Sequence, residues 1–292
     1  MRRMSVVGRI PLITTLLALV NAVQPAPVFP QPGDATEPPA SSSAAAVSPL
    51  EIEDAERFLR EAKITRSESI PIGVTRPQRV TLSDGQRTAR GIWKTVDIFK
   101  PIQRFDDGTV EMSFRDSWEN EIAAYELDKL LGLSRVPPVV KRRWRRQVGS
   151  LQLWLEDVMT EAERIEKKIL APDTEEWNRQ MYTVRLVHNL CDDSDFNNVG
   201  NLLVDKDFRV WIIDHSRSFR NNKELRNPGD LDRFSRDLLD KIRRLDSALL
   251  TERLGRWLTK KQIETLLIRR DLILERADML VESLGEEKVL YP

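Results

Sequence analysis

The segment DFNNVGNLLVDKDFRVWIIDHSRSF, residues 195–219, carries more structural information than any other part of this chain. Its polar start predicts a loop, and the two short apolar runs that follow, joined by an Asp-Lys-Asp turn, predict a β-hairpin. Such a hairpin places Asp195, Asn201 and Asp214 around one cleft. Two carboxylates and a carboxamide suit a divalent metal beside a phosphate, because magnesium prefers oxygen ligands and shares them with substrate phosphates. An ordinary hairpin would show the same turn residues, so the rest of the chain must decide between a structural hairpin and a metal site.

Upstream of this segment the sequence predicts a group of β-strands. Apolar and β-branched residues favour strands at 67–72, 78–82 and 88–96, and the Ser-Asp-Gly sequence at 83–85 marks the turn between the last two. Lys94 lies within the third strand, directly after Gly-Ile-Trp. A lysine inside an apolar strand predicts either a functional amine that points into a cleft or a strand-edge side chain with its head in water.

A strongly periodic helix is predicted over 116–131, with the sequence DSWENEIAAYELDKLL. Asp116 or Ser117 is expected to cap its N-terminus, because a short polar side chain followed by an acid typically begins a helix. Two acids, Glu121 and Glu126, are candidates to point inward. Two further strands are predicted at 139–143 and 150–156.

The second half of the sequence is mainly helical apart from the 195–219 hairpin. A short amphipathic helix is also predicted before the first strand, at 51–63. The remaining predicted helices cover 161–170, 176–190, 230–246, 248–257 and 260–284. Strands gathered in one half and helices in the other predict an α+β fold with two lobes.

The chain contains a strand lysine, then an acidic helix and then the 195–219 hairpin. This order resembles the catalytic core of the protein-kinase-like superfamily. The resemblance is to its atypical branches, the phosphatidylinositol kinases and the secretory-pathway kinases, in which an Asp-containing loop precedes Gly-Asn-Leu-Leu and Ile-Asp-His follows. It implies a bilobal protein-kinase-like fold with a small β-rich N-lobe, residues 51–157, and a mainly helical C-lobe, residues 158–292. It also implies ATP and Mg²⁺ or Mn²⁺ as cofactors.

The same resemblance assigns residues to a nucleotide site. Lys94 would hold the α- and β-phosphates, and Glu121, with Glu126 as the alternative, would orient Lys94. Residues 153–157, Leu-Trp-Leu-Glu-Asp, would form the hinge beside adenine, so Glu156 is included in the cofactor site. Gly-Val-Thr at 73–75 would be part of the loop that covers the nucleotide.

The hairpin would supply the metal ligands and the catalytic base. The resemblance implies that Asp214 is the main metal ligand. It implies that Asn201 either binds a second metal ion or braces the loop. It also implies that Asp195 accepts or orients the proton of the acceptor hydroxyl. Protein kinases place this Asp five residues before the Asn, whereas here Phe196 occupies that position and Asp195 lies six before Asn201. Asp193 therefore remains an alternative base.

The N-terminus predicts export or a membrane tether. Arg2 and Arg3 precede an apolar run at 10–20, as in a signal peptide or N-terminal anchor over residues 1–23, and residues 24–50 form a Pro/Ser/Ala-rich linker. The chain has 46 basic and 46 acidic side chains, so its overall charge predicts no nucleic-acid partner. A single cysteine excludes an intrachain disulfide, and two histidines give no basis for a zinc site.

The basic run KRRWRR at 141–146 is the strongest charge cluster. It suits an anionic surface, such as a lipid, a polymer or a phosphorylated substrate, and it equally suits the solvated end of a hairpin above a packed tryptophan.

The sequence thus favours an atypical kinase that phosphorylates a hydroxyl on a protein, a sugar or a lipid. A kinase-fold module that binds a nucleotide or a partner without catalysis is the alternative, and a tethered interaction protein is the third.

Overall fold

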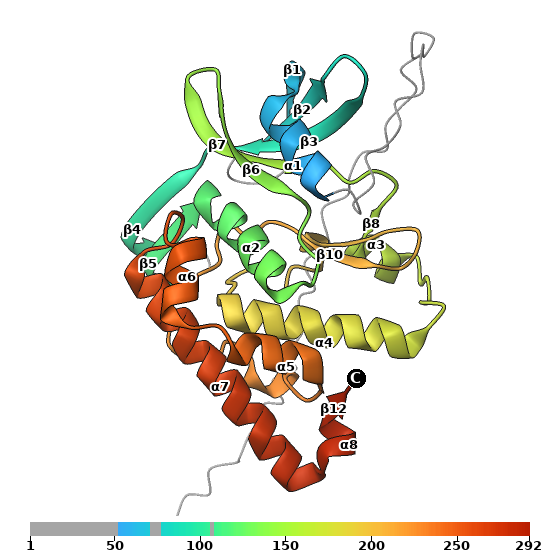
Figure 1. The fold of residues 1–292 in the computed structure, drawn as a ribbon, viewed down its shortest axis with the longest axis vertical. Coiled ribbons are helices and arrows are strands. Elements are labelled where there is room, and N and C mark those ends of the chain that lie inside the picture. The colour runs from blue at the N-terminus through green and yellow to red at the C-terminus, as the bar shows by residue number, and fades with distance from the viewer. Residues whose placement is uncertain (1–51, 71–76, 106–107) are drawn as a thin grey trace, which may run out of the picture. The chain divides into compact units, whose positions relative to one another are not determined.

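The computed structural model describes residues 52–70, 77–105 and 108–292 (Figure 1). The predicted signal peptide, the linker at 24–50 and the nucleotide-covering loop at 73–75 lie outside these residues. No helix among the described residues is both long enough and apolar enough to cross a membrane.

The first half of the described chain forms a five-stranded antiparallel sheet. Its strands lie in the order β1-β2-β3-β7-β6. The bounds are β1 Lys63–Ser69, β2 Gln78–Ser83, β3 Thr88–Lys94, β6 Val139–Trp144 and β7 Gln147–Leu153. Helix α1, Ile52–Glu61, covers one face of this sheet (Figure 1). Alternate strand residues such as Val80, Leu82 and Trp93 pack there against Phe58 and Leu59, so the other face is left for polar side chains.

A second, two-stranded sheet lies between β3 and the next helix, where the sequence analysis predicted no element. It consists of β4, Asp97–Arg104, and β5, Val110–Ser117. Almost every β4 side chain is exposed, including Phe99 at 63%. The strand therefore shows no alternation of apolar and polar residues, and this is the signal on which strand prediction depends.

Helix α2, Trp118–Leu131, ends as predicted and begins two residues later. Asp116 and Ser117 still belong to β5, and the Ser117 side chain caps the helix by accepting a hydrogen bond from the N–H of Glu119. Gly132, with φ +61°, ends it in the left-handed conformation that glycine adopts without strain. Both faces of α2 are largely buried, because it lies between the five-stranded sheet and the helical part (Figure 1).

The second half is helical, as predicted. Its helices are α3 Glu161–Glu166, α4 Thr174–Cys191, α5 Arg236–Arg243, α6 Ser247–Leu254, α7 Lys260–Leu284 and α8 Glu286–Val289. The bounds of α7 match the prediction at both ends. The helix predicted over 230–246 is shorter, because Phe234–Ser235 forms strand β11 and pairs with β12, Leu290–Tyr291. The main core of the protein lies among α2, α4, α5, α6 and α7.

The hairpin predicted at 195–219 is present. Strands β9, Leu202–Val204, and β10, Val210–Ile212, pair in antiparallel register, and β8, Met159–Thr160, joins the outer side of β9. The Asp205 side chain closes the turn by accepting hydrogen bonds from the N–H groups of Asp207 and Arg209. The one-turn 3₁₀ helix η1, Val199–Asn201, leads into β9.

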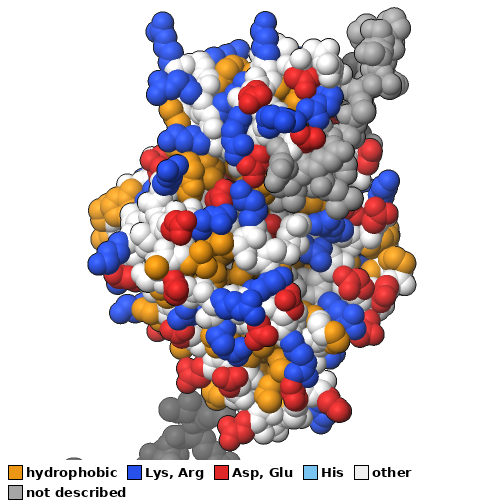
Figure 2. Space-filling model, viewed as in Figure 1, with side chains coloured by type: hydrophobic (Ala, Val, Ile, Leu, Met, Phe, Trp, Pro, Cys, Tyr) orange, Lys and Arg blue, Asp and Glu red, His pale blue; other side chains and the backbone are white. Residues whose placement is uncertain are grey.

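The basic run at 141–146 forms the tip of the β6–β7 hairpin, where positive φ angles at Arg145 and Arg146 make the turn. Part of this charge has a structural role, since Arg142 donates to the carbonyls of Leu59 and Ala62 at the end of α1. Trp144 packs edge-to-face on another tryptophan of the sheet. Acidic and basic side chains are interspersed over the face shown in Figure 2. An anionic partner for this tip stays a prediction.

Candidate active site

Lys94 connects three elements that are far apart in the sequence. Its Nζ lies 2.5 Å from Oε1 of Glu121 on α2 and 2.7 Å from Oδ1 of Asp214, two residues after β10. Because Gly91 and Trp93 face α1, the alternation of β3 turns Lys94 to the opposite face of the sheet. The main chain of β7 lies very close to Lys94 because residue 149 is glycine. A Cβ at this position would lie only 2.1 Å from the carbonyl oxygen of Lys94.

The helix orientation decides between the two candidate glutamates. Glu121 is 1% exposed and faces Lys94. Glu126 lies five residues later, about 140° around the helix axis, and pairs instead with Lys129 and Arg253. Only Glu121 is therefore placed to orient Lys94.

Around Lys94, the neighbouring charges and the burial shift the side-chain pKa values in opposite directions. Burial alone lowers the pKa of Lys94, but the negative charges of Glu121 and Asp214 outweigh it and raise the pKa above its ordinary value. The charge of Lys94 in turn lowers the pKa of Asp214, against the effect of burial. Lys94 is thus cationic and Asp214 anionic at neutral pH. The Asp214 side chain is 46% exposed and can receive a further cation.

We expect Glu121→Gln to weaken the binding of Mn²⁺–ATP about tenfold, or about 1.4 kcal/mol. Without the glutamate charge, the Lys94 ammonium keeps Asp214 as its one charged partner and competes with the metal for it. Isothermal titration calorimetry measures the change. Glu126→Gln, the same substitution on the same helix, should leave the affinity unchanged; equal affinities for Glu121→Gln and wild type would contradict the expectation.

The main chain around Asp214 is held in an unusual conformation. Asp214 has φ +63°, in the left-handed region that few non-glycine residues adopt, and several hydrogen bonds stabilise it there. The N–H of His215 donates to Glu121, and Ser216 Oγ lies 3.4 Å from Asp214 Oδ1. Asn120 on α2 donates to the carbonyl of Ser216 at 2.8 Å. The helix that carries Glu121 therefore also fixes the turn that carries Asp214.

The loop before β9 brings Asp195 to Asn201. Oδ2 of Asp195 accepts hydrogen bonds from Nδ2 of Asn201 at 3.0 Å and of Asn198 at 3.2 Å. The 3₁₀ turn η1 lies between Asn198 and β9. Asp193, the alternative base, is 2% exposed, and its Oδ1 accepts the N–H of Asp195. This geometry favours Asp195 as the accessible carboxylate.

Two buried histidines lie beside Asp193. Nε2 of His188 is 3.9 Å from Oδ2 of Asp193, and His215 is fully buried. Burial lowers the pKa of each histidine to about 4, so both are neutral at pH 7.

These histidines should make the folded protein less stable in acid. Their folded-state pKa of about 4 lies below the ordinary 6.5, so the unfolded chain binds more protons and the unfolding free energy falls as the pH drops from 6.5 towards 4. At pH 5 the loss is about 2 kcal/mol for each histidine. Urea unfolding at pH 7 and pH 5 measures it, and His188→Gln should remove the contribution of His188, about 2 kcal/mol. Equal pH dependence in the variant and the wild type would count against this cause.

The predicted hinge, residues 153–157, makes contacts that the sequence did not reveal. Glu156 forms a bidentate ion pair with Arg90 of β3, with Arg90 Nε 2.7 Å from Oε1. The N–H of Trp154 donates to the carbonyl of Arg90, and the guanidinium carbons of Arg79 and Arg90 lie 5.5 and 5.4 Å from the centre of a Trp154 ring. The Glu156 carboxylate is therefore already paired, and its contact with a nucleotide stays a prediction.

Asp116 is a third carboxylate at this site, considered from the sequence only as a helix cap. It is 8% exposed at the end of β5, and its Oδ1 is buried without a hydrogen-bond partner among the described residues. Burial raises its pKa, and the charge of Asp214 raises it further. A buried oxygen without a partner beside a half-exposed carboxylate fits a bound cation.

The oxygen donors suit Mg²⁺ or Mn²⁺. Asp214 and Asp116 would supply carboxylates to such a metal, and Asn201 would supply an amide oxygen. Within residues 52–70, 77–105 and 108–292, no three His, Cys, Asp or Glu residues gather closely enough to hold a metal by themselves.

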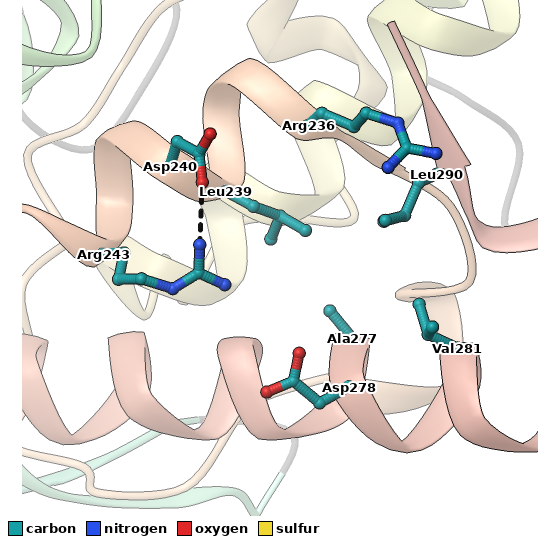
Figure 3. Close-up of a pocket in the computed structure, with 8 residues that line it drawn as sticks. All are labelled: Arg236, Leu239, Asp240, Arg243, Ala277, Asp278, Val281 and Leu290. Carbon is teal, nitrogen blue, oxygen red and sulfur yellow. Dashed lines mark hydrogen bonds and ion pairs between the residues drawn. The ribbon is translucent and has the colours of Figure 1, made fainter. Parts of the chain in front are cut away.

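A separate pocket between α5 and α7 contains none of these residues (Figure 3). Three of its charged side chains are already paired, Arg243 with Asp240 within the pocket and Arg236 with Glu286 outside it (Figure 3). This pocket offers no comparable chemistry.

Comparison with known proteins reveals the fold. No protein-family profile and no curated protein matches this chain. Among solved structures, a hydra Fam20 structure with sugar matches with a TM-score of 0.60 and 18% identity, over 86% of this chain and 95% of the other. The chain has an atypical protein-kinase-like fold.

Two structures of the Golgi casein kinase match as well, each over 84% of this chain and 79% of the other at 14% identity. Their TM-scores are 0.56 and, for the structure with Mn/ADP bound, 0.57. The predicted α+β kinase-like class is thus confirmed. At these identities the comparisons show the fold alone, so the roles of Lys94, Glu121, Glu156, Asp195, Asn201 and Asp214 and the lobe boundary at 157/158 stay predictions.

Proposed function

We propose that this protein is a phosphotransferase that uses ATP and Mg²⁺ or Mn²⁺ to phosphorylate a hydroxyl acceptor. The observation that carries the proposal is the contact of Lys94 with both Glu121 and Asp214. A largely buried amine with two carboxylates, one of them half exposed, is far more than the stability of a strand requires, and it suits the phosphates and metal of a nucleotide.

In this proposal Lys94 binds the α- and β-phosphates, and Glu121 holds the ammonium group in position. Asp214 is the main metal ligand, with Asn201 and Asp116 as further oxygen donors. The bound metal would neutralise the negative charge of the phosphates. The protein otherwise contributes positioning, since phosphoryl transfer asks for little covalent chemistry.

Asp195 accepts the proton of the acceptor hydroxyl. Both amide donors, Asn198 and Asn201, bind its Oδ2, which leaves Oδ1 to face the acceptor. The amides also fix the carboxylate plane before the acceptor arrives, and such positioning is what general-base catalysis requires.

Two known proteins of this fold support the cofactors and the type of reaction. The Golgi casein kinase has been solved with Mn/ADP bound, and the hydra Fam20 structure contains a sugar. By analogy we extend nucleotide, metal and a hydroxyl acceptor to this chain. Export or membrane tethering through residues 1–23 belongs to the same proposal and rests on the sequence of that segment.

Transfer of radiolabelled phosphate tests the proposal. The full chain is incubated with [γ-³²P]ATP, Mg²⁺ or Mn²⁺, and a panel of degenerate Ser/Thr peptides, dephosphorylated casein, oligosaccharides and phosphoinositides. We expect metal-dependent transfer to at least one acceptor class. Metal-dependent nucleotide binding without transfer to the panel or to water would instead support the non-catalytic binding module.

A further inference from the structure

The basic run KRRWRR holds three arginines without a charged partner. Arg143, Arg145 and Arg146 are exposed, and none of them forms an ion pair within the described part of the chain. We call these three residues the basic tip. The other two cations of the run are engaged in the fold, since Arg142 binds α1 and Lys141 lies over two tryptophan rings. Figure 2 shows Lys and Arg side chains projecting from the upper end of the molecule, where Figure 1 places the β6–β7 hairpin.

The two residues of the hairpin turn are poorly suited to the backbone conformation that they adopt. Trp144 pairs with Gln147, so the turn consists of Arg145 and Arg146 alone, with φ +46° and +66°. Asparagine and glycine adopt such a two-residue turn at the lowest cost. The Arg145 guanidinium lies 4.3 Å from the centre of a Trp144 ring, and this contact returns less stability than the left-handed conformation costs. Stability of the hairpin therefore does not explain arginines at the turn, and strain of this kind is typical of functional sites.

The position of the basic tip favours a flat anionic surface as its partner. The three arginines lie at the projecting end of a hairpin (Figure 1). A nucleic-acid strand is bound instead along a basic groove, and the balanced charge of the whole chain argues against such a partner. A projecting tip fits the headgroups of an anionic phospholipid bilayer, where each Lys or Arg strengthens binding about fivefold.

The N-terminal segment would bring the basic tip to a membrane. The predicted signal peptide or anchor is followed by the linker at 24–50, which leads to α1. A flexible linker of this length spans about 30 Å. Helix α1 is about 15 Å long, and Arg142 binds the carbonyls at its end. The turn follows about 10 Å further along β6. Because these lengths are similar, an N-terminal anchor and the basic tip can reach the same membrane.

We propose that the basic tip binds the headgroups of an anionic phospholipid membrane and orients the β-rich part of the chain towards it. Lys94 pairs with Ser150 of β7, which is three residues, or about 10 Å, from Gln147 beside the turn. The candidate nucleotide site would therefore lie close to the lipid headgroups. The choice of a membrane rests on the N-terminal tether proposed above, whereas the charge contact does not depend on phosphate transfer.

Partition of the full chain into lipid vesicles tests the proposal. Vesicles of phosphatidylcholine alone are compared with vesicles that contain about 30% phosphatidylglycerol. The measured quantity is the ratio of the two partition coefficients, anionic over neutral. We expect a ratio of at least about 100 at about 0.1 M NaCl, and a ratio near 1 at about 1 M NaCl, where the Debye length falls to about 3 Å. The N-terminal segment has arginines of its own, so variants are needed to isolate the basic tip.

Arg145→Asn with Arg146→Gly removes two charges and gives the turn the residues that it favours. We expect the ratio to fall about 30-fold. The melting temperature without lipid should rise by at least about 2 °C, because the turn is no longer strained. The matched control is Lys167→Asn with Lys168→Gly, an exposed pair after α3 in which Lys168 also has a positive φ of +55°. The control should keep the ratio within about twofold of wild type.

The outcomes separate the basic tip from the tether and from catalysis. A ratio within about twofold of wild type in the tip variant, or an equal fall in the control, overturns the proposal. A wild-type ratio near 1 at low salt also overturns it, and retention of the wild type on heparin, lost in the tip variant, would then identify an anionic polymer as the partner. A lower melting temperature in the tip variant would show that the arginines stabilise the turn, which overturns their functional interpretation.

Failure of the other proposals gives different results. If the chain does not partition into phosphatidylcholine, the N-terminal tether is wrong, and the coefficients of the wild type and the tip variant on anionic vesicles still decide whether the basic tip binds lipid. If the chain transfers no phosphate, the phosphotransferase function is wrong, and the vesicle measurements are unaffected.

Discussion

Asp214→Asn is expected to lower phosphoryl transfer by about 10³-fold or more. The substitution removes the half-exposed carboxylate that we assign to the metal and leaves Lys94 paired with Glu121 alone. Asparagine is preferred to alanine here, because it tolerates the left-handed backbone conformation at this position (φ +63°). The loss therefore reports chemistry more than folding. Initial rates of transfer at saturating ATP and Mn²⁺ provide the measurement.

The matched control for this substitution lies in the same hairpin. Asp207→Asn makes the same chemical change at an exposed position of the turn between β9 and β10 and should keep the wild-type rate. Retention of more than about a tenth of the wild-type rate in Asp214→Asn would rule out Asp214 as the main metal ligand. An unchanged melting temperature without nucleotide would confirm that the variant is folded.

Asp195→Asn is expected to lower the rate constant kcat by about 10² to 10⁴-fold, as for the loss of a general base. The affinity for Mn²⁺–ATP should remain, since Lys94, Glu121 and Asp214 are untouched. The amide can still accept hydrogen bonds from Asn198 and Asn201 through its oxygen, so the loop should keep its shape. Single-turnover rates and calorimetry, measured together, separate the loss of catalysis from the retained binding.

Asp193→Asn serves as the comparison for the base assignment. Its oxygen can still accept the N–H of Asp195, so the loop geometry is retained while the carboxylate charge is lost. We expect a change in kcat of less than about tenfold. A larger loss in Asp193→Asn than in Asp195→Asn would reverse the assignment and make the buried carboxylate the base.

The sequence predicted the elements whose signals are local. Helix α7 was found from its helical period, and the β9–β10 hairpin was found from its Asp-Lys-Asp turn. Each of these signals lies within a short stretch of sequence. The same holds for α2, where Ser117 and the acidic first turn mark the start. The resemblance selected Lys94, Asp214 and one of two glutamates, Glu121 or Glu126, and the structure brings Lys94 into contact with Glu121 and Asp214.

The missed features depend on contacts between distant segments. Strand β4 has almost no buried side chain and no regular alternation, whereas β5 alternates Val110, Met112 and Phe114 with polar residues, a signal that the prediction missed. Asp116 lies at the candidate site because the end of β5 is hydrogen-bonded to the turn that follows Asp214. The pairing of Glu156 with Arg90 joins positions 66 residues apart. No pattern within one window of sequence contains such information.

Metal-dependent nucleotide binding by the full chain tests the central claim most directly. The melting temperature is measured during titration with ATP, in the presence of Mn²⁺ and in the presence of EDTA. We expect a saturable rise with Mn²⁺ that EDTA abolishes and that Asp214→Asn removes. An unchanged melting temperature with ATP, ADP or GTP, with Mg²⁺ or Mn²⁺ present, would contradict the assignment of a nucleotide–metal site to Lys94, Glu121 and Asp214.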